Sequence, residues 1–260
     1  MNKETEFYTL GIDSGSTYTK GAIFDGKSII KKCKIRTSAK PKETIYNVYN
    51  DLYNEKVKFV VTTGYGRSLL KESDKQITEI TCHAQGAAFL NPKTRTIIDL
   101  GGQDCKVINL DNSLNVIDFI MNDKCAAGTG RFIEVMMRIL EEDINNIDIF
   151  VKNKNIVNIS SMCTVFAESE IISLLAKDID RGDIALGILH SIAKRTASFS
   201  KRLNTNDLVF FTGGLANSKE FNEILSFYLN HEVFSHELSQ YAGAIGAAII
   251  AYKKVSKKDR

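Results

Sequence analysis

The chain has 260 residues, 34 Lys and Arg against 31 Asp and Glu for a net charge of +3, and 43% hydrophobic residues. These values are typical of a globular protein of one or two domains, exclude disordered and fibrous classes, and give no indication of a nucleic-acid partner. The longest apolar run, 243–252, is shorter than the roughly 20 residues that a membrane span needs, and the N-terminus lacks the apolar core of a signal peptide, so we expect a cytoplasmic protein without a membrane partner.

Apolar periodicity and turn residues predict strands and helices that alternate along the chain. Strands are expected over 8–13, 21–24, 29–35, 57–63, 96–99, 106–110, 116–121 and 208–211. Helices are expected over 42–54, 82–89, 130–141, 165–177, 183–203, 219–229 and 242–254. This order indicates an α/β fold with mixed sheets, with a domain boundary at Asn91–Pro92.

One segment of the sequence repeats. Residues 11–25 align with residues 97–111 at a constant offset of 86, which matches Asp13 with Asp99 and Lys20 with Lys106. Each copy reads as a strand, a glycine-containing turn and a second strand, the pattern of a β-hairpin. The repeat predicts two similar halves.

The turns of the two hairpins have the composition of phosphate-binding loops. Around Gly15, small hydroxyl residues leave the backbone N–H groups open to an anion. A carboxylate at the strand end, Asp13 or Asp99, could hold Mg²⁺ directly or through its waters. Paired glycines at Gly213 and Gly214, between a predicted strand and a predicted helix, would also allow a ligand close to the backbone. An ordinary loop is the alternative in each case.

Four segments together resemble a known superfold. Residues 11–20 (GIDSGSTYTK), 98–104 (IDLGGQD), 211–217 (FTGGLAN) and 241–248 (YAGAIGAA) are similar to the phosphate 1, phosphate 2, adenosine and second connecting motifs of the actin, heat-shock-70 and sugar-kinase superfold. The resemblance implies two ribonuclease-H-like, actin-like ATPase domains with mixed sheets and a nucleotide cleft between them. Domain I would comprise 1–94 plus 245–260, and domain II 95–244.

The same resemblance implies which residues bind ATP or ADP and Mg²⁺. Donors to the phosphates would be Ser14, Gly15, Ser16, Thr17, Gly101, Gly102 and Gln103, with Gly213, Gly214 and Asn217 at the adenosine and Asp13 and Asp99 at the metal. Lys20 could neutralise phosphate charge or point to solvent. Gln103 or Asp104 could orient the attacking water, because phosphoryl transfer depends mainly on positioning. Glu168 is the other candidate for catalysis, or only a partner of a helix dipole.

Two of the five cysteines precede predicted helices. No C-x-x-C pair is present, which argues against a disulfide framework and against a self-contained zinc site. Cys125 and Cys163 come just before the helices expected over 130–141 and 165–177, where the helix dipole favours a thiolate. A homodimer could supply the four thiolates of an iron–sulfur cluster, two from each subunit. Small buried cysteines are the alternative.

The residues around these cysteines resemble a specific family. Residues 124–132 (KCAAGTGRF) and 163–170 (CTVFAESE) are similar to the cluster-ligand motifs of the ATP-dependent activators of 2-hydroxyacyl-CoA dehydratases, a family that also contains benzoyl-CoA reductase ATPase subunits. Residues 63–67 (TGYGR) and 78–87 (TEITCHAQGA) also resemble that family.

The family resemblance implies a function. Cys125 and Cys163 would ligate one [4Fe–4S] cluster shared by a homodimer, at the N-termini of paired helices whose angle changes with ATP hydrolysis. The protein would pass a low-potential electron from ferredoxin or flavodoxin to a partner dehydratase or related reductase. Cys33, Cys82 and Cys105 match no ligand position and are expected to be core or surface thiols.

Three alternatives stay open from the sequence. The same ATPase could serve a double-cubane cluster protein. The chain could instead be a small-molecule kinase of the same superfold, for instance acting on an amino sugar. It could also be a nucleotide-dependent scaffold that has lost its cluster.

Overall fold

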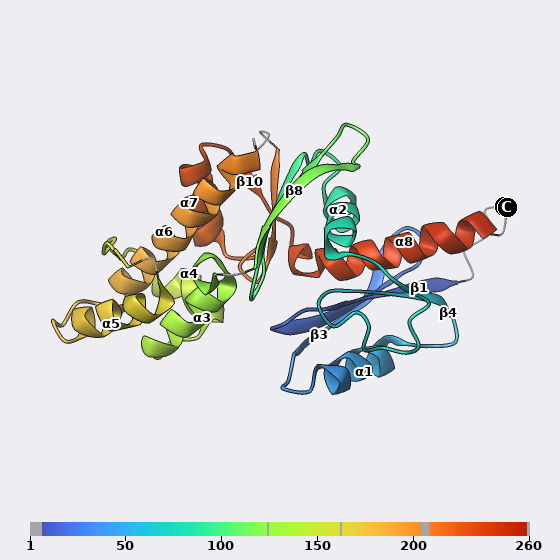
Figure 1. Cartoon of the computed structure of the whole chain (residues 1–260), viewed down its shortest axis with the longest axis horizontal. Coiled ribbons are helices and arrows are strands. Elements are labelled where there is room, and N and C mark those ends of the chain that lie inside the picture. Colours follow the sequence, from blue (N-terminus) through green and yellow to red (C-terminus); the bar gives the residue numbers. More distant parts are fainter. Residues whose placement is uncertain (1–6, 124, 162, 204–207, 259–260) are drawn as a thin grey trace. The chain divides into compact units, whose positions relative to one another are not determined.

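The computed structural model describes residues 7–123, 125–161, 163–203 and 208–258. The chain divides into two compact units, each with its own five-stranded sheet (Figure 1). The first unit draws its residues from Met1–Thr94, Leu110–Ile117 and Leu238–Arg260, and the second from Arg95–Asn109 and Asp118–Glu237.

The first sheet has the strand order β3-β2-β1-β4-β5. Its central strand β1 (Tyr8–Ser14) pairs antiparallel with β2 (Tyr18–Phe24) and parallel with β4 (Val57–Thr63). The outer strands are β3 (Ile29–Arg36) and β5 (Lys75–Gln76). The sheet is therefore mixed, as predicted.

The two faces of β1 carry different residues because successive side chains alternate in direction. Leu10 and Ile12 are fully buried and pack in one cluster with residues of helix α1 (Pro41–Leu52). Between them, Gly11 lies under helix α8 (Ala242–Lys258), where an added Cβ would stand 2.0 Å from the Ala244 carbonyl oxygen. Glycine thus lets α8 lie directly on the sheet. Helix α2 (Glu79–Leu90) packs beside α8.

The second sheet repeats the first. Its order is β10-β9-β6-β7-β8, with β6 (Thr96–Leu100) antiparallel to β7 (Cys105–Leu110) and parallel to β9 (Val209–Gly213). The outer strands are β8 (Val116–Asn122) and β10 (Val233–Phe234). The register pairs Asp99 with Lys106 just as it pairs Asp13 with Lys20, which confirms the repeat.

Helices of the second unit enclose its larger core. They are α3 (Gly130–Ile139), α4 (Ile147–Phe150), α5 (Thr164–Leu175), α6 (Arg181–Ser200) and α7 (Lys219–Leu229), with short 3-10 turns at Ala126–Gly128, Ile144–Asn146 and Lys201–Leu203, and at Ser239–Tyr241 in the first unit. Phe132 and Met136 of α3 and Ile188 of α6 are fully buried in one cluster.

All fifteen strands and helices predicted from the sequence are present, and the differences have local causes. The predicted strand over 21–24 already begins at Tyr18, because the pairing with β3 extends to the Tyr18–Arg36 pair. The two-residue strands β5 and β10 and the one-turn helix α4 are too short to show a period. In the described part of the chain, no helix is both long and apolar enough to cross a membrane.

Candidate functional site

In the first unit, Asp13 is the second-to-last residue of β1 and is surrounded by glycines. Its side chain is buried, with 6% of its surface exposed. A Cβ on Gly243 would lie 2.8 Å from Asp13 Oδ2 and 2.9 Å from His83 Nε2, and one on Gly64 would lie 2.7 Å from Asp13 Oδ1. Gly64 also has a φ of +89°, which favours glycine. The backbones of the 64 and 243 segments therefore close around this carboxylate.

The turn after Asp13 is held by backbone groups. Gly66 N–H donates to the Ser14 carbonyl at 3.0 Å, and the Thr37 hydroxyl donates to the Gly15 carbonyl at 2.8 Å. The Ser14 hydroxyl is buried and has no hydrogen-bond partner among the described residues. Gly15 is half-buried, as are the next residues of the turn, Ser16 and Thr17. Hydrogen bonds thus hold the carbonyls of Ser14 and Gly15, while residues 15–17 stay partly exposed to solvent.

Lys20 lies on β2 across from Asp13 in the register, and it is half-buried. Its neighbour in the other direction is Lys34 of β3, whose pKa is lowered by burial and then by the charge of Lys20. The two ammonium groups make this edge of the hairpin electropositive.

In the second unit, Asp99 occupies the equivalent position near a strand end, where a hydroxyl and an ammonium group contact it. The Thr212 hydroxyl donates to Asp99 Oδ1 at 2.8 Å, and Lys106 Nζ lies 3.4 Å from Asp99 Oδ2. Lys106 also lies 2.7 Å from Asp104 Oδ2, although the Lys106 side chain is only 3% exposed. These contacts of Lys106 were not predicted, and its match with Lys20 in the repeat was the signal that could have identified them.

The turn after β6, which was predicted as the phosphate 2 motif, is hydrogen-bonded to the start of α3. Gly130 N–H donates to the Gly101 carbonyl at 2.8 Å, and Arg131 N–H donates to the Gly102 carbonyl at 3.0 Å. A Cβ on Gly101 would stand 2.2 Å from Asp104 Oδ1, so the turn tolerates only glycine there without moving Asp104. The position of α3 is therefore tied to the shape of this turn.

The third glycine segment lies next to the same strand end. Gly213 has a φ of +102°, and its missing Cβ would stand 2.1 Å from the Leu100 carbonyl oxygen. Gly214 N–H donates to that carbonyl at 3.3 Å, and a Cβ on Gly214 would meet nothing within 4 Å. Asn217 donates from Nδ2 to the Glu237 carbonyl at 3.5 Å. Gly214 is thus an open position at the end of β9.

The cysteines divide by exposure. Cys125 immediately precedes the 3-10 turn Ala126–Gly128, Cys163 immediately precedes α5, and both are exposed. Cys82 and Cys105 are buried, and burial raises the pKa of each thiol to about 12. Cys33 is half-buried. At neutral pH the two buried thiols are protonated, and the two exposed thiols are open to a ligand.

Sequence reasoning missed two residues that hold the cysteine loops, one that joins both loops and one that contacts only the loop before Cys163. Arg195 of α6 donates from one guanidinium nitrogen to the Ala127 carbonyl at 2.9 Å and from another to the Ser161 carbonyl at 2.7 Å. Glu170 accepts from Ser161 N–H at 2.8 Å and from the backbone and hydroxyl of Ser160. Arg195 is distant from both loops in sequence and gives no local signal, whereas Glu170 ends the CTVFAESE segment.

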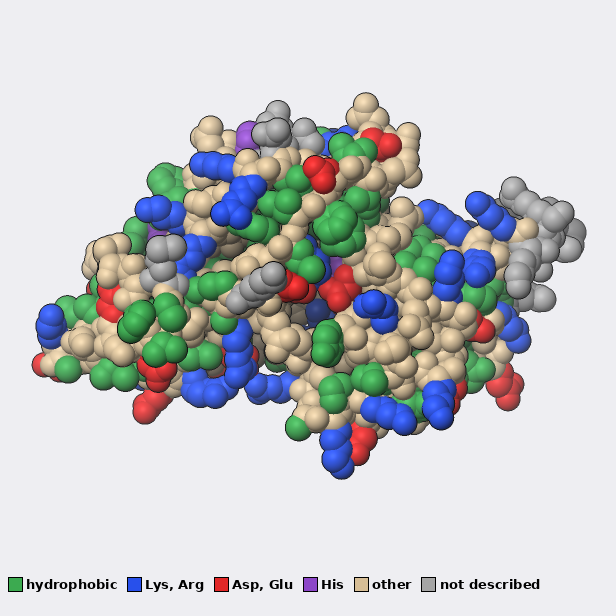
Figure 2. All heavy atoms as spheres, in the orientation of Figure 1, with side chains coloured by type: hydrophobic (Ala, Val, Ile, Leu, Met, Phe, Trp, Pro, Cys, Tyr) green, Lys and Arg blue, Asp and Glu red, His purple; other side chains and the backbone are tan. Residues whose placement is uncertain are grey.

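The remaining predicted residues lie on the surface. Gln103 is exposed in its turn, and Glu168 is exposed on α5. Among the described residues, no group of three or more His, Cys, Asp or Glu side chains could hold a metal ion within one chain. Figure 2 shows apolar side chains on the surface over α3 to α5, and α5 exposes Val165, Phe166 and Ile172.

Comparisons with known proteins agree with these features. The model of the BadF/BadG/BcrA/BcrD ATPase family matches residues 10–251. The chain is 44% identical to the (R)-2-hydroxyglutaryl-CoA dehydratase activating ATPase of Acidaminococcus fermentans, over 96% of this chain and 99% of that protein. It is 42% identical to the 2-hydroxyisocaproyl-CoA dehydratase activator of Clostridioides difficile, over 97% of this chain and 98% of that one.

A solved structure is similar as a whole. The activator of the 2-hydroxyisocaproyl-CoA dehydratase from Clostridium difficile with bound ADPNP superposes with a TM-score of 0.91 at 43% identity, covering 98% of each chain. Its likeness extends over both sheets and all the segments described above. The family match and the high identity over nearly the whole length lead to one conclusion: the chain belongs to the BadF/BadG/BcrA/BcrD ATPase family.

Proposed function

We propose that this protein hydrolyses ATP and uses an iron–sulfur cluster to donate a low-potential electron to a partner 2-hydroxyacyl-CoA dehydratase or related reductase, which it thereby activates. The names of two relatives support the ATPase and the dehydratase partner. The observation that carries the proposal is the pair of hydrogen bonds from Gly130 and Arg131 to the Gly101 and Gly102 carbonyls. Through them, the predicted phosphate turn is tied to the helix that follows the Cys125 loop.

The nucleotide would be ATP or ADP, as in the relative with bound ADPNP. The turns at 14–17 and 101–103 would donate to its phosphates, and the segment of Gly213, Gly214 and Asn217 would contact the adenosine. Asp13 and Asp99 fit Mg²⁺ because each is a buried carboxylate at a strand end, and Mg²⁺ binds through one or two carboxylates plus its waters and phosphates.

Gln103 is the better candidate for orienting the attacking water. Its side chain is exposed, whereas the carboxylate of Asp104 is held by Lys106 at 2.7 Å. Hydrolysis needs an oriented water more than a strong base. A part for Glu168 in linking hydrolysis to the cluster stays a prediction.

The cysteines fit one [4Fe–4S] cluster per homodimer, with Cys125 and Cys163 donated by each subunit. Both thiols are exposed at the start of helical segments, and Arg195 ties their loops to one another. The buried Cys82 and Cys105 do not fit, because neither thiol is accessible to a cluster shared between two subunits. When bound, such a cluster stores one electron at low potential, supplied by ferredoxin or flavodoxin.

Domain closure on the nucleotide would act on the cysteines through the backbone. Contact of a phosphate with the Gly101 turn would shift the carbonyls that hold the first two amides of α3. Because the 3-10 turn at Ala126–Gly128 leads directly into α3, the shift would reach Cys125. Hydrolysis would reverse it, which makes delivery of the electron depend on ATP.

Iron and acid-labile sulfide per subunit, measured on anaerobically reconstituted protein together with its mass by light scattering, test this proposal. We expect about four iron and four sulfide per dimer. Cys125→Ser and Cys163→Ser should each abolish iron binding and spare nucleotide binding, and Cys33→Ser is the matched control that should bind iron normally. A metal-free monomer after reconstitution would refute the proposal.

A further inference from the structure

The strongest unexplained feature of the second unit is the guanidinium of Arg195. It is half-buried in α6, and its two hydrogen bonds reach two separate segments, at Ala127 and at Ser161. It also lies over the ring of Phe132, 4.9 Å from the ring centre. One side chain therefore contacts the turn after Cys125, the loop before Cys163 and the first turn of α3.

These contacts depend on the shape of arginine. Its guanidinium is planar and presents several N–H donors in a fixed fork, so that two carbonyls can be held in one geometry while the flat face stacks on a ring. A lysine ammonium at the same place is a compact charge without that plane. Carbonyl acceptors on two segments, rather than a carboxylate, show that the contact fixes backbone positions.

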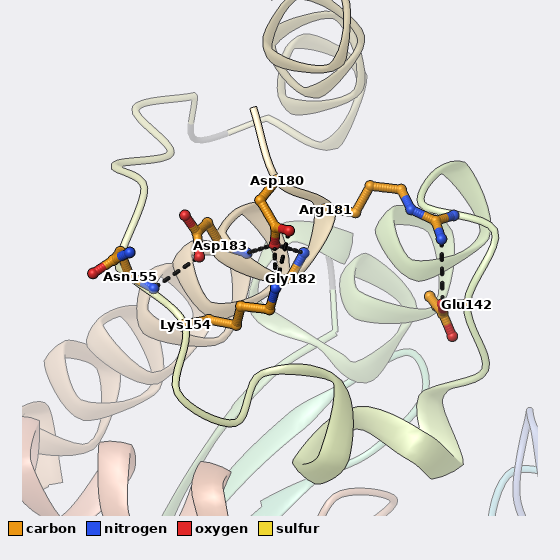
Figure 3. Close-up of polar contacts among 7 residues, drawn as sticks. All are labelled: Glu142, Lys154, Asn155, Asp180, Arg181, Gly182 and Asp183. Atoms are coloured by element: carbon orange, nitrogen blue, oxygen red, sulfur yellow. Dashed lines mark hydrogen bonds and ion pairs between the residues drawn. The ribbon is translucent and has the colours of Figure 1, made fainter. Parts of the chain in front are cut away.

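Arg195 lies on helix α6, a long helix with a capped N-terminus. Its 20 residues span about 30 Å, and its N-terminus is capped by Asp180, which accepts from the amides of Gly182 and Asp183 and pairs with Lys154 at 2.8 Å. Figure 3 shows Asp180 and Asp183 facing Lys154 and Asn155, while Arg181 points toward Glu142.

Arg181 ties this end of α6 to the far end of α3. It donates to the carbonyl of Leu140, the C-cap of α3, at 2.8 Å and lies 3.6 Å from Glu142. At the other end, Arg195 lies against the first turn of α3. The two arginines thus fasten α3 to one rigid helix at both of its ends.

We propose that Arg195 is a positioning residue that holds the Cys125 and Cys163 loops in one fixed arrangement, so that both thiols meet the same cluster. This inference rests on the proposed function for the cluster. The contacts of Arg195 with Ala127 and Ser161, which we call the Arg195 clamp, are present in the chain without metal. The charge of Arg195 has a second consequence. Adding an electron to a cluster adds negative charge, so a nearby cation raises its reduction potential.

The test compares Arg195→Met and Arg195→Lys with Lys194→Met, a matched control that removes an exposed cation at the neighbouring position. In metal-free protein, hydrogen exchange is measured by mass spectrometry over 125–131 and 160–167. We expect Arg195→Met to increase the rate of hydrogen exchange about tenfold or more in each of the two segments. Unchanged exchange in β6 and β9 of the variant would show that it is folded. Lys194→Met should match the wild type.

The same proteins are then reconstituted with iron and sulfide and treated with a chelator. We expect about tenfold faster loss of iron from Arg195→Met, an intermediate rate from Arg195→Lys and a lower midpoint potential for Arg195→Met. Wild-type exchange in either segment of Arg195→Met, or wild-type iron loss, would overturn the inference. Failure of the wild type itself to take up iron would refute the proposed function. The hydrogen-exchange comparison alone would then show whether Arg195 holds the two loops.

Discussion

The carbonyl of Gly101 accepts the N–H of Gly130 at 2.8 Å, and this bond joins the turn after β6 to the first residue of α3. It links the two motifs that the sequence singled out for different chemistry, one for phosphate and one for the cluster. Nothing in the local sequence pairs these residues, since each is a glycine in its own turn.

Gly130→Pro tests this link. The extended backbone of Thr129 suits a following proline, and the substitution removes the N–H that Gly101 accepts. Because the proline ring Cδ takes the place of that hydrogen, the Gly101 carbonyl must also move away from residue 130. We expect the ATP-induced change in hydrogen exchange over 125–131 to disappear when the measurement is made at an ATP concentration that saturates the variant. Gly130→Ala keeps the N–H, although its Cβ would stand 3.0 Å from the Gly101 carbonyl oxygen, and it should retain that change because the hydrogen bond is still made. An undiminished response in Gly130→Pro would show that coupling takes another route.

Lys106→Met should destabilise the second unit strongly. The ammonium is buried between Asp99 and Asp104, and its removal leaves two carboxylates without their cation. Breaking such a buried pair costs about 3 kcal/mol of unfolding free energy or more, which urea denaturation would measure. Lys20, its counterpart in the repeat, is half-buried, so Lys20→Met should lower the free energy of unfolding by less than about 1 kcal/mol. Equal losses would contradict the different roles of the two lysines.

Ser14→Ala tests whether the Ser14 hydroxyl, in the turn after β1, stabilises the fold or binds nucleotide. The Ser14 hydroxyl is buried and lacks a hydrogen-bond partner among the described residues, so its removal should leave the Tm of the nucleotide-free protein unchanged or raise it. If the hydroxyl donates to a phosphate, the rise of Tm on adding ATP and Mg²⁺ should be smaller than in the wild type. A lower Tm without nucleotide would mean that the hydroxyl stabilises the turn itself.

Alkylation should distinguish the cysteines. In metal-free native protein at pH 8, iodoacetamide should modify Cys125 and Cys163 first, because both are exposed. Cys82 and Cys105 should stay unmodified until the protein unfolds, since burial both shields them and raises their pKa to about 12. Mass spectrometry of peptides taken over time gives the order. Early modification of Cys105 would contradict the packing of β7.

Whether a feature could be predicted from the sequence depends on how far apart along the chain its residues lie. The order of the predicted strands and helices indicated the α/β class with mixed sheets, and the repeat around Asp13 and Asp99 predicted two similar halves, because periodicity, hairpin patterns and glycine turns are local. The contacts of Lys106 and Arg195 were missed because they join segments through the tertiary fold, as between Arg195 and Ser161. Local patterns thus predict which residues could carry chemistry, and tertiary packing determines which side chains hold them in place.

Glu170 provides the pH dependence of the Cys163 loop. Its carboxylate is partly desolvated, which raises its pKa, but hydrogen bonds from Ser161 and Ser160 outweigh burial and lower the pKa from 4.5 to about 2. A carboxyl whose pKa is lower in the folded state stabilises the fold above its unfolded value and loses that effect on acidification. The contribution should therefore be complete above about pH 4.5 and fall toward pH 2.

Thermal melts of Glu170→Gln against the wild type measure this contribution. The variant cannot ionise, so its Tm should lie below that of the wild type at pH 7, and the gap should narrow as the pH falls below about 4.5. Glu168→Gln, which replaces an exposed carboxylate two residues away on α5, is the matched control. A gap that stays constant or widens on acidification would mean that Glu170 acts through its shape alone, and the loop before Cys163 would then be held chiefly by Arg195.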